Sequence, residues 1–124
     1  MSQTTAYSPQ AYRRGAVLSA PPERLIVMLY DGARRFLHQA AAAMRAEQVE
    51  DAHNKLRRAE DIVAYLRDTL DLEQGEIAVR LQSIYLFSQR HLRQARIERD
   101  PAKIEQVSEL LGRLREAWAA IERT

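Results

Sequence analysis

The chain contains no cysteine among its 124 residues, which excludes disulfide bonds, thiolate catalysis and cysteine-rich zinc sites. It also has no long hydrophobic run. The longest one, Leu25–Tyr30, falls far short of the ~20 apolar residues that span a bilayer. The first residues lack the basic start and the apolar stretch of a secretory signal peptide. We therefore expect a cytosolic protein that does not insert into membranes.

Neither sign of charge is in large excess. The chain has 19 Lys and Arg residues against 17 Asp and Glu residues, which gives a formal net charge of +2. Basic residues are interleaved with acidic ones, as where Arg57 and Arg58 precede Glu60. Such interleaving is typical of a solvated helix surface, whereas nucleic-acid binding needs basic residues clustered on one face. We therefore expect no nucleic-acid partner, and a bundle that binds DNA or RNA is the weakest alternative.

Glycine and proline are scarce, with four residues of each type, and they divide the chain into a tail and four long segments. Residues 1–20 show no periodicity and are rich in Ser, Thr, Gln and Ala. A segment of this composition is typically flexible unless it docks on a partner. We expect residues 1–20 to form a flexible N-terminal tail and residues 21–124 to form one domain.

The four long segments show the hydrophobic spacing of amphipathic helices. Apolar residues recur at intervals of three and four over 22–45, from Val49 to Leu70, from Ile77 to Ala95 and from Ile104 to Ile121. Asp100-Pro101 supplies a favoured N-cap followed by a favoured first helical residue. Long helices joined by short connections predict an all-α fold, an antiparallel up-down four-helix bundle with a flexible N-terminal tail.

Few residues could support catalysis or metal binding. Glu50 and His53 have the Glu-x-x-His spacing of di-iron bundles, but those sites need two such units and two further glutamates. Here the unit occurs once, and the chain has no glycine-rich phosphate loop and no HExxH motif. His91 lies on the apolar line of the third segment, where we expect a hydrogen-bonded structural histidine. We therefore expect no enzyme activity, no metal and no cofactor.

Two stretches carry more apolar residues than a bundle core requires. A core-facing helix needs an apolar stripe of about three residues in seven, whereas Leu25–Tyr30 and Ile84–Phe87 are uninterrupted. Either these helices pack on two sides, or part of their surface binds the amphipathic helix of a partner. The pattern leaves both possibilities open and favours a small helical bundle that serves as a binding module.

The run Leu25–Ala33 reads L-I-V-M-L-Y-D-G-A, which resembles the opening-helix motif L-I-x-M-L-Y-D-G-A of the FliS family, the flagellin export chaperones. Further similarities follow in the family's order, at Tyr12–Pro22, Arg58–Leu66, Leu70–Ala78 and Leu114–Trp118. The chain departs from the family pattern at Ser19–Pro22, which replaces T-A-S-P, at Gln74, which replaces a glycine, and at Arg96, which replaces an asparagine. None of these changes threatens the fold.

The resemblance implies a cytosolic chaperone of the flagellar type III export system. Such a chaperone binds the disordered C-terminal segment of flagellin, prevents its premature polymerisation and assists its delivery to a component of the export gate. It needs no nucleotide, metal or other cofactor. The alternative is a structural bundle that self-associates through its surplus apolar face, or a generic helical adaptor, and a homodimer without cargo is also open.

The resemblance also indicates residues that contact a partner. In this family the N-terminal tail covers part of the cargo surface when cargo is absent, which by position implicates Tyr7, Tyr12, Val17 and Leu18. On the bundle, we expect cargo to contact outward-facing members of the apolar surplus, namely Ile62, Tyr65, Tyr85 and Phe87. We assign Trp118 to the core.

Overall fold

The structure, a computed structural model, describes residues 22–122. Its elements are α2 (Pro22–Arg45), α3 (Val49–Asp68), the 3-10 helix η1 (Leu72–Gln74), α4 (Glu76–Glu98) and α5 (Pro101–Glu122). The helix predicted over 22–45 matches α2, and the predicted boundary at Asp100-Pro101 matches the start of α5. The tail predicted for residues 1–20 lies outside the described residues, together with Tyr7, Tyr12, Val17 and Leu18.

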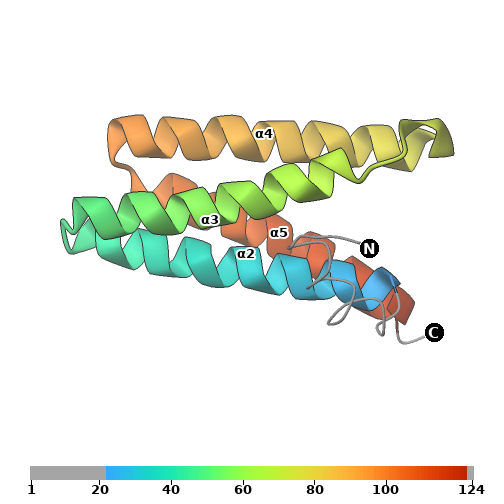
Figure 1. Ribbon diagram of the computed structural model, residues 1–124, viewed down its shortest axis with the longest axis horizontal. Helices are drawn as coiled ribbons and strands as arrows, with labels where there is room; N and C mark the ends of the chain where they lie inside the picture. The colour runs from blue at the N-terminus through green and yellow to red at the C-terminus, as the bar shows by residue number, and fades with distance from the viewer. Residues whose placement is uncertain (1–21, 123–124) are drawn as a thin grey trace, which may run out of the picture.

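The four α-helices run alternately in opposite directions, as Figure 1 shows. α2 is central to the packing, because it contacts both α3 and α5 extensively. α4 contacts α3 and α5 less extensively, and it runs along the top of the view in Figure 1, beyond α3 from α2. The predicted antiparallel up-down four-helix bundle is confirmed.

Side chains from all four α-helices meet in one apolar core. The largest completely buried side chains include Tyr30, Leu37, Leu56, Leu92, Ile104 and Leu111. Trp118 is partly buried and packs against this core, as expected. Removing apolar surface from water, at about 25 cal/mol per Å², is the main term that stabilises such a core.

Two residues that we assigned to the apolar seams are exposed instead. The side chain of Val49 is 61% exposed and that of Ile77 is 73% exposed. Each lies in the first turn of its helix, and each lines a cleft at the end of the bundle. Helical periodicity identifies the inner face of a helix but does not show where neighbouring helices stop covering it. The prediction was therefore wrong at these two helix ends.

The α2–α3 and α4–α5 loops lie at the same end of the bundle (Figure 1) and share one geometry. Glu47 in the first loop has a φ of 59°, and Arg99 in the second has a φ of 55°. In each loop the N–H of the next residue donates to the carbonyl oxygen five positions before it, at 2.9 and 3.0 Å. These are Schellman motifs, whose left-handed residue is usually glycine. The conformation costs a residue with a side chain about 1–2 kcal/mol.

Candidate functional site

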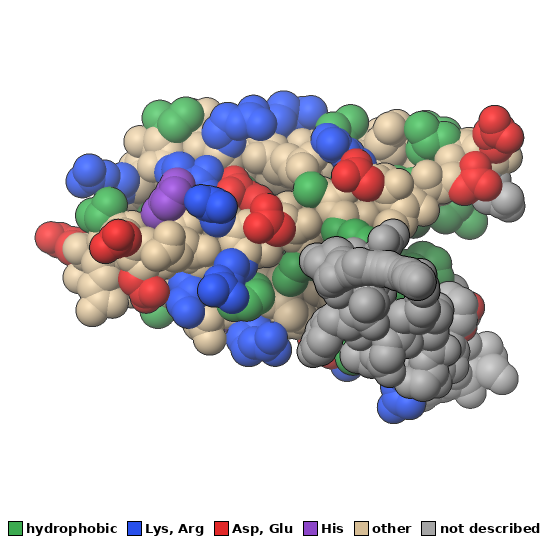
Figure 2. Space-filling view, viewed as in Figure 1, with side chains coloured by type: hydrophobic (Ala, Val, Ile, Leu, Met, Phe, Trp, Pro, Cys, Tyr) green, Lys and Arg blue, Asp and Glu red, His purple; other side chains and the backbone are tan. Residues whose placement is uncertain are grey.

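Among the side chains whose exposure the structure describes, the exposed large hydrophobic ones are concentrated on α4. Seven such side chains are exposed, and four of them belong to α4: Ile77, Val79, Phe87 and Ile97. We call these four residues the α4 surface. α4 is also the helix with the least contact to its neighbours, so more of its circumference faces solvent. Figure 2 shows hydrophobic side chains at intervals along the edge that α4 forms, separated by basic side chains.

A cleft lies near each end of α4. The large cleft has a volume of about 1000 Å³ and lies between the α2–α3 loop and the last turn of α4. The small cleft has a volume of about 300 Å³ near the start of α4 and is lined by residues that include Ile26, Leu70, Ile77, Leu81, Tyr85 and Trp118. The two clefts and the α4 surface make α4 the helix best placed to contact a partner.

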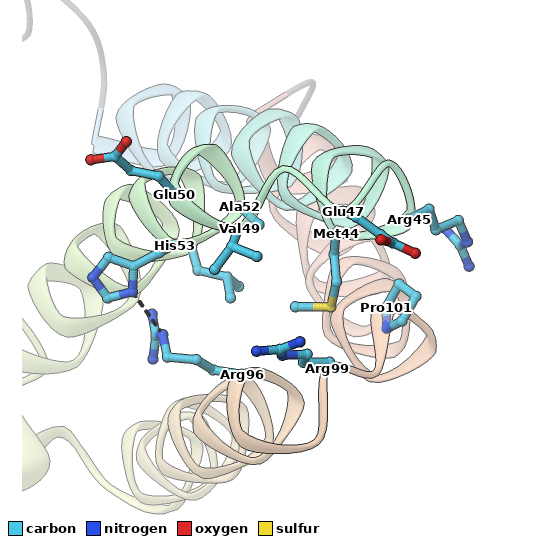
Figure 3. A pocket seen from close by; sticks show the side chains of 11 residues that line it. Met44, Arg45, Glu47, Val49, Glu50, Ala52, His53, Arg96, Arg99 and Pro101 are labelled. Carbon is cyan, nitrogen blue, oxygen red and sulfur yellow. Dashed lines mark hydrogen bonds between the residues drawn. The ribbon is translucent and has the colours of Figure 1, made fainter.

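The large cleft combines apolar surface with basic side chains (Figure 3). Its apolar surface comes from Met44, Val49, Ala52, Leu56 and Pro101. Facing these residues, the end of α4 contributes Arg96 and Arg99. The cleft therefore suits a ligand that is partly apolar and partly anionic.

Two arginines of the large cleft have acidic partners. Arg45 donates to both carboxylate oxygens of Glu105, at 2.5 and 2.9 Å, and these hydrogen bonds lower the pKa of that carboxyl group. Arg96 donates to both carboxylate oxygens of Glu60, at 2.7 and 3.0 Å. Arg96 also donates to Nδ1 of His53 at 3.2 Å, which is the dashed line in Figure 3. These contacts join α2 to α5 and α3 to α4.

Arg99 is the exception among the arginines that line the large cleft. Within residues 22–122, its guanidinium group has neither an ion pair nor a hydrogen bond. Figure 3 shows the side chain extending from the end of α4 into the cleft. The cleft therefore contains a positive charge that no described carboxylate neutralises.

Two tyrosines are buried beside the small cleft. The hydroxyl oxygens of Tyr30 in α2 and Tyr85 in α4 are 2.5 Å apart and share a hydrogen bond. Burial raises the pKa of both phenols, and hydrogen bonds with Tyr85 and Trp118 offset part of this effect at Tyr30. The pair connects α2 to α4, two helices that otherwise have little contact.

One of the four bundle residues expected to face outward does not do so. The side chain of Tyr85 is only 2% exposed, because its hydroxyl group bonds inward to Tyr30. The expectation that Tyr85 faces outward is therefore wrong, although its side chain lines part of the small cleft.

The other three residues lie on two helices and differ in exposure. Phe87 is exposed on α4 and stacks on His91, with ring centroids 4.9 Å apart. Ile62 and Tyr65 are partly buried on α3, and Ile62 lies against Gly32 of α2. A role for Ile62, Tyr65 and Phe87 in partner binding stays a prediction.

The polar residues singled out for possible chemistry lie at the surface or serve packing. Glu50 and His53 are exposed at the start of α3. In the part of the chain that the structure describes, no group of three or more metal-ligating side chains could hold a metal ion. His91 bonds to Gln106 at 2.6 Å, in the structural role expected of it. None of the helices over 22–122 is long and apolar enough to cross a membrane.

Sequence reasoning missed the large cleft and its unpaired arginine. A helix that ends without glycine must often place another residue in the left-handed position. The stretch Glu98–Asp100 contains no glycine, so this absence was the available signal for Arg99.

Known proteins similar to this chain are flagellar chaperones. The sequence model of the family described as flagellar protein FliS matches residues 3–124. The flagellar secretion chaperone FliS of Salmonella typhimurium is 37% identical over 123 residues, which cover 94% of this chain and 91% of the relative. The flagellar secretion chaperone FliS of Vibrio cholerae is 34% identical, over 92% of this chain and 88% of the relative.

A solved structure shares the fold. It is described as the crystal structure of a flagellar chaperone from bacteria, and it superimposes with a TM-score of 0.77 at 15% identity. The match covers 94% of this chain and 97% of that chain. The family assignment rests on the sequence match over residues 3–124 and on the relatives above 30% identity. The chain belongs to the FliS family, which is a family of flagellar secretion chaperones and not of enzymes.

Proposed function

We propose that the chain binds the C-terminal segment of flagellin in the cytosol, prevents its premature polymerisation and assists its delivery to a component of the flagellar export gate. Membership of the FliS family supports a role as a flagellar export chaperone. The cargo, its bound segment and its destination are those that the sequence motifs imply.

The observation that carries the proposal is the α4 surface. Side chains such as Ile97, which is 69% exposed, leave apolar area in contact with water. Burying this area against a partner would gain about 25 cal/mol per Å². A disordered cargo segment that folds as an amphipathic helix along α4 would cover this area. Ordering such a segment opposes binding, so the complex stays reversible, which release to an export gate requires.

Further contacts with the cargo complete the proposal. On α3, the partly buried side chains of Ile62 and Tyr65 offer further apolar contacts in addition to Phe87 of the α4 surface. The N-terminal tail would cover part of the cargo surface when cargo is absent, through Tyr7, Tyr12, Val17 and Leu18.

A titration with a synthetic peptide of the flagellin C-terminal segment from the same organism tests the proposal. We expect calorimetry to show a one-to-one complex and circular dichroism to show a gain in helix. Replacing Phe87 and Ile97 together by serine should weaken binding by at least about tenfold, because burying one large apolar side chain is worth about 1.5–3 kcal/mol.

The matched control is Met28→Ser. Met28 is 50% exposed, but it lies on α2, and its replacement should change the affinity by no more than about twofold. The proposal is contradicted if the native chain shows neither heat of binding nor a change in circular dichroism. A stable dimer that the peptide does not dissociate would instead favour self-association through the same apolar surface.

A further inference from the structure

The large cleft has the size and chemistry of a binding site of its own. Its volume of about 1000 Å³ is at the upper end of the range of pockets that hold ligands. Met44 and Val49 line it with apolar atoms, and Arg99 extends into it (Figure 3). Such a combination of apolar surface and a few polar groups is usual in sites that recognise a particular ligand.

Arg99 carries a positive charge that the surrounding structure does not neutralise. Of the two acids that line the cleft, Glu50 points away from it in Figure 3, and neither Glu50 nor Glu47 forms an ion pair with Arg99. A guanidinium group pairs with a carboxylate through two parallel hydrogen bonds. A carboxylate is therefore the ligand group that best matches the guanidinium group of Arg99.

Arg99 shares an unusual backbone conformation with one other residue that lines the cleft, Glu47. With a φ of 55°, Arg99 occupies a position that glycine adopts without a steric penalty. Glu47 has nearly the same φ in the loop across the cleft, which makes it a natural control.

The segment before α2 offers no acidic side chain to pair with Arg99. Residues 1–21 contain no aspartate or glutamate. The occupant is therefore best sought in another protein.

We propose that the large cleft binds a segment of a partner protein in which an acidic residue stands beside aliphatic side chains. Arg99 pairs with the carboxylate, and Met44 and Val49 contact the aliphatic groups. This site is distinct from the α4 surface, and it does not require the cargo to be flagellin.

Two short peptides test the proposal on the full chain. The probes are acetyl-Leu-Glu-Leu-amide and acetyl-Leu-Gln-Leu-amide, titrated at low ionic strength while NMR follows the methyl signals of Met44 and Val49. The glutamate peptide should shift these signals and bind at least about tenfold more tightly, because a hydrogen bond to a charged group is stronger than a neutral one. Equal binding of the two peptides, or no shift with either, overturns the proposal.

A pair of variants separates recognition from folding. Arg99→Gly and Glu47→Gly both relieve a left-handed residue, so neither should lower the Tm. Only Arg99→Gly should abolish the preference for the glutamate peptide. The proposal is overturned if Arg99→Gly keeps that preference, or if it dissociates a dimer of the native chain, which would make the cleft an interface between copies. Binding of the flagellin peptide is measured separately, so failure of one proposal does not imply failure of the other.

Discussion

Tyr30 and Tyr85 connect two helices that otherwise have little contact, through hydroxyl oxygens 2.5 Å apart. Both side chains are excluded from water, at 0% and 2% exposure. In such surroundings a hydrogen bond is stronger than at the surface, and an unmade one costs more. The pair is therefore a specific polar connection between α2 and α4 within an apolar core.

Replacing each tyrosine alone by phenylalanine should lower the free energy of unfolding. The two single losses should add up to more than the loss in the double variant. Tyr85→Phe removes one partner of the Tyr30 hydroxyl, at about 1–3 kcal/mol. Tyr30→Phe should cost a similar amount, because it leaves the buried Tyr85 hydroxyl group without this partner. Urea unfolding followed by circular dichroism measures these free energies. Strictly additive losses would contradict a direct coupling between the two residues.

The raised pKa values of Tyr30 and Tyr85 predict a loss of stability in alkali. In the unfolded chain both phenols ionise near the ordinary pKa of 10.0, whereas burial keeps them protonated to higher pH in the folded chain. The two phenols therefore contribute fully to the free energy of unfolding below pH 10.0, and this contribution is lost as the pH rises above 10.0. Urea midpoints at a series of alkaline pH values should fall less steeply when both tyrosines are replaced by phenylalanine. Parallel slopes would exclude these phenols as the cause.

The helices and their boundaries were predictable because their signals are local. Asp100 and Pro101 are adjacent in the sequence, and Oδ1 of Asp100 accepts a hydrogen bond from the N–H of Ala102 at 3.0 Å. Such a cap needs no partner from another helix, so the residue types alone identify it. The apolar repeat likewise identifies the inner face of each helix.

The candidate site was less predictable because its contacts join distant positions. Tyr85 turns inward only because Tyr30 lies opposite it in another helix. Arg96 forms its ion pair with Glu60 of α3. The large cleft depends on where two loops end relative to each other, as the exposure of Val49 shows. None of these relationships has a periodic signature.

Two buried serines should respond differently to replacement by alanine. Among the described residues, the Oγ atom of Ser88 has no hydrogen-bond partner. Ser108 Oγ lies 3.3 Å from His38 Nε2 and accepts from Arg34 Nε at 3.4 Å. Ser88→Ala should stabilise the chain by about 1 kcal/mol, because it removes an unsatisfied group and raises helix propensity. Ser108→Ala gains the same helix propensity but loses the contacts with His38 and Arg34, so it should be less stable than Ser88→Ala. Equal shifts in Tm for the two variants would contradict this difference in hydrogen bonding.

Glycine at 112 makes room for an arginine. A Cβ atom there would lie 2.9 Å from Cζ of Arg34, whereas a Cβ atom at Gly32 would lie 3.5 Å from Ile62, an ordinary contact. Gly32→Ala should therefore gain most of the ~1 kcal/mol difference in helix propensity. Gly112→Ala should gain less, because Arg34 must move. Thermal unfolding in an Arg34→Ala background should remove the difference, and its persistence there would point to another cause.

The limited contact of α4 with its neighbours sets the order in which amide hydrogens exchange with solvent. Regions with fewer buried contacts open at lower free energy than the whole molecule. α2 stays packed between α3 and α5 when α4 separates, so the amides of α4 should exchange before those of α2. Such a partial opening breaks the hydrogen bond of Tyr85 and exposes the inner side of α4. We therefore predict a partially open state of the bundle that widens its apolar surface without unfolding the other three helices.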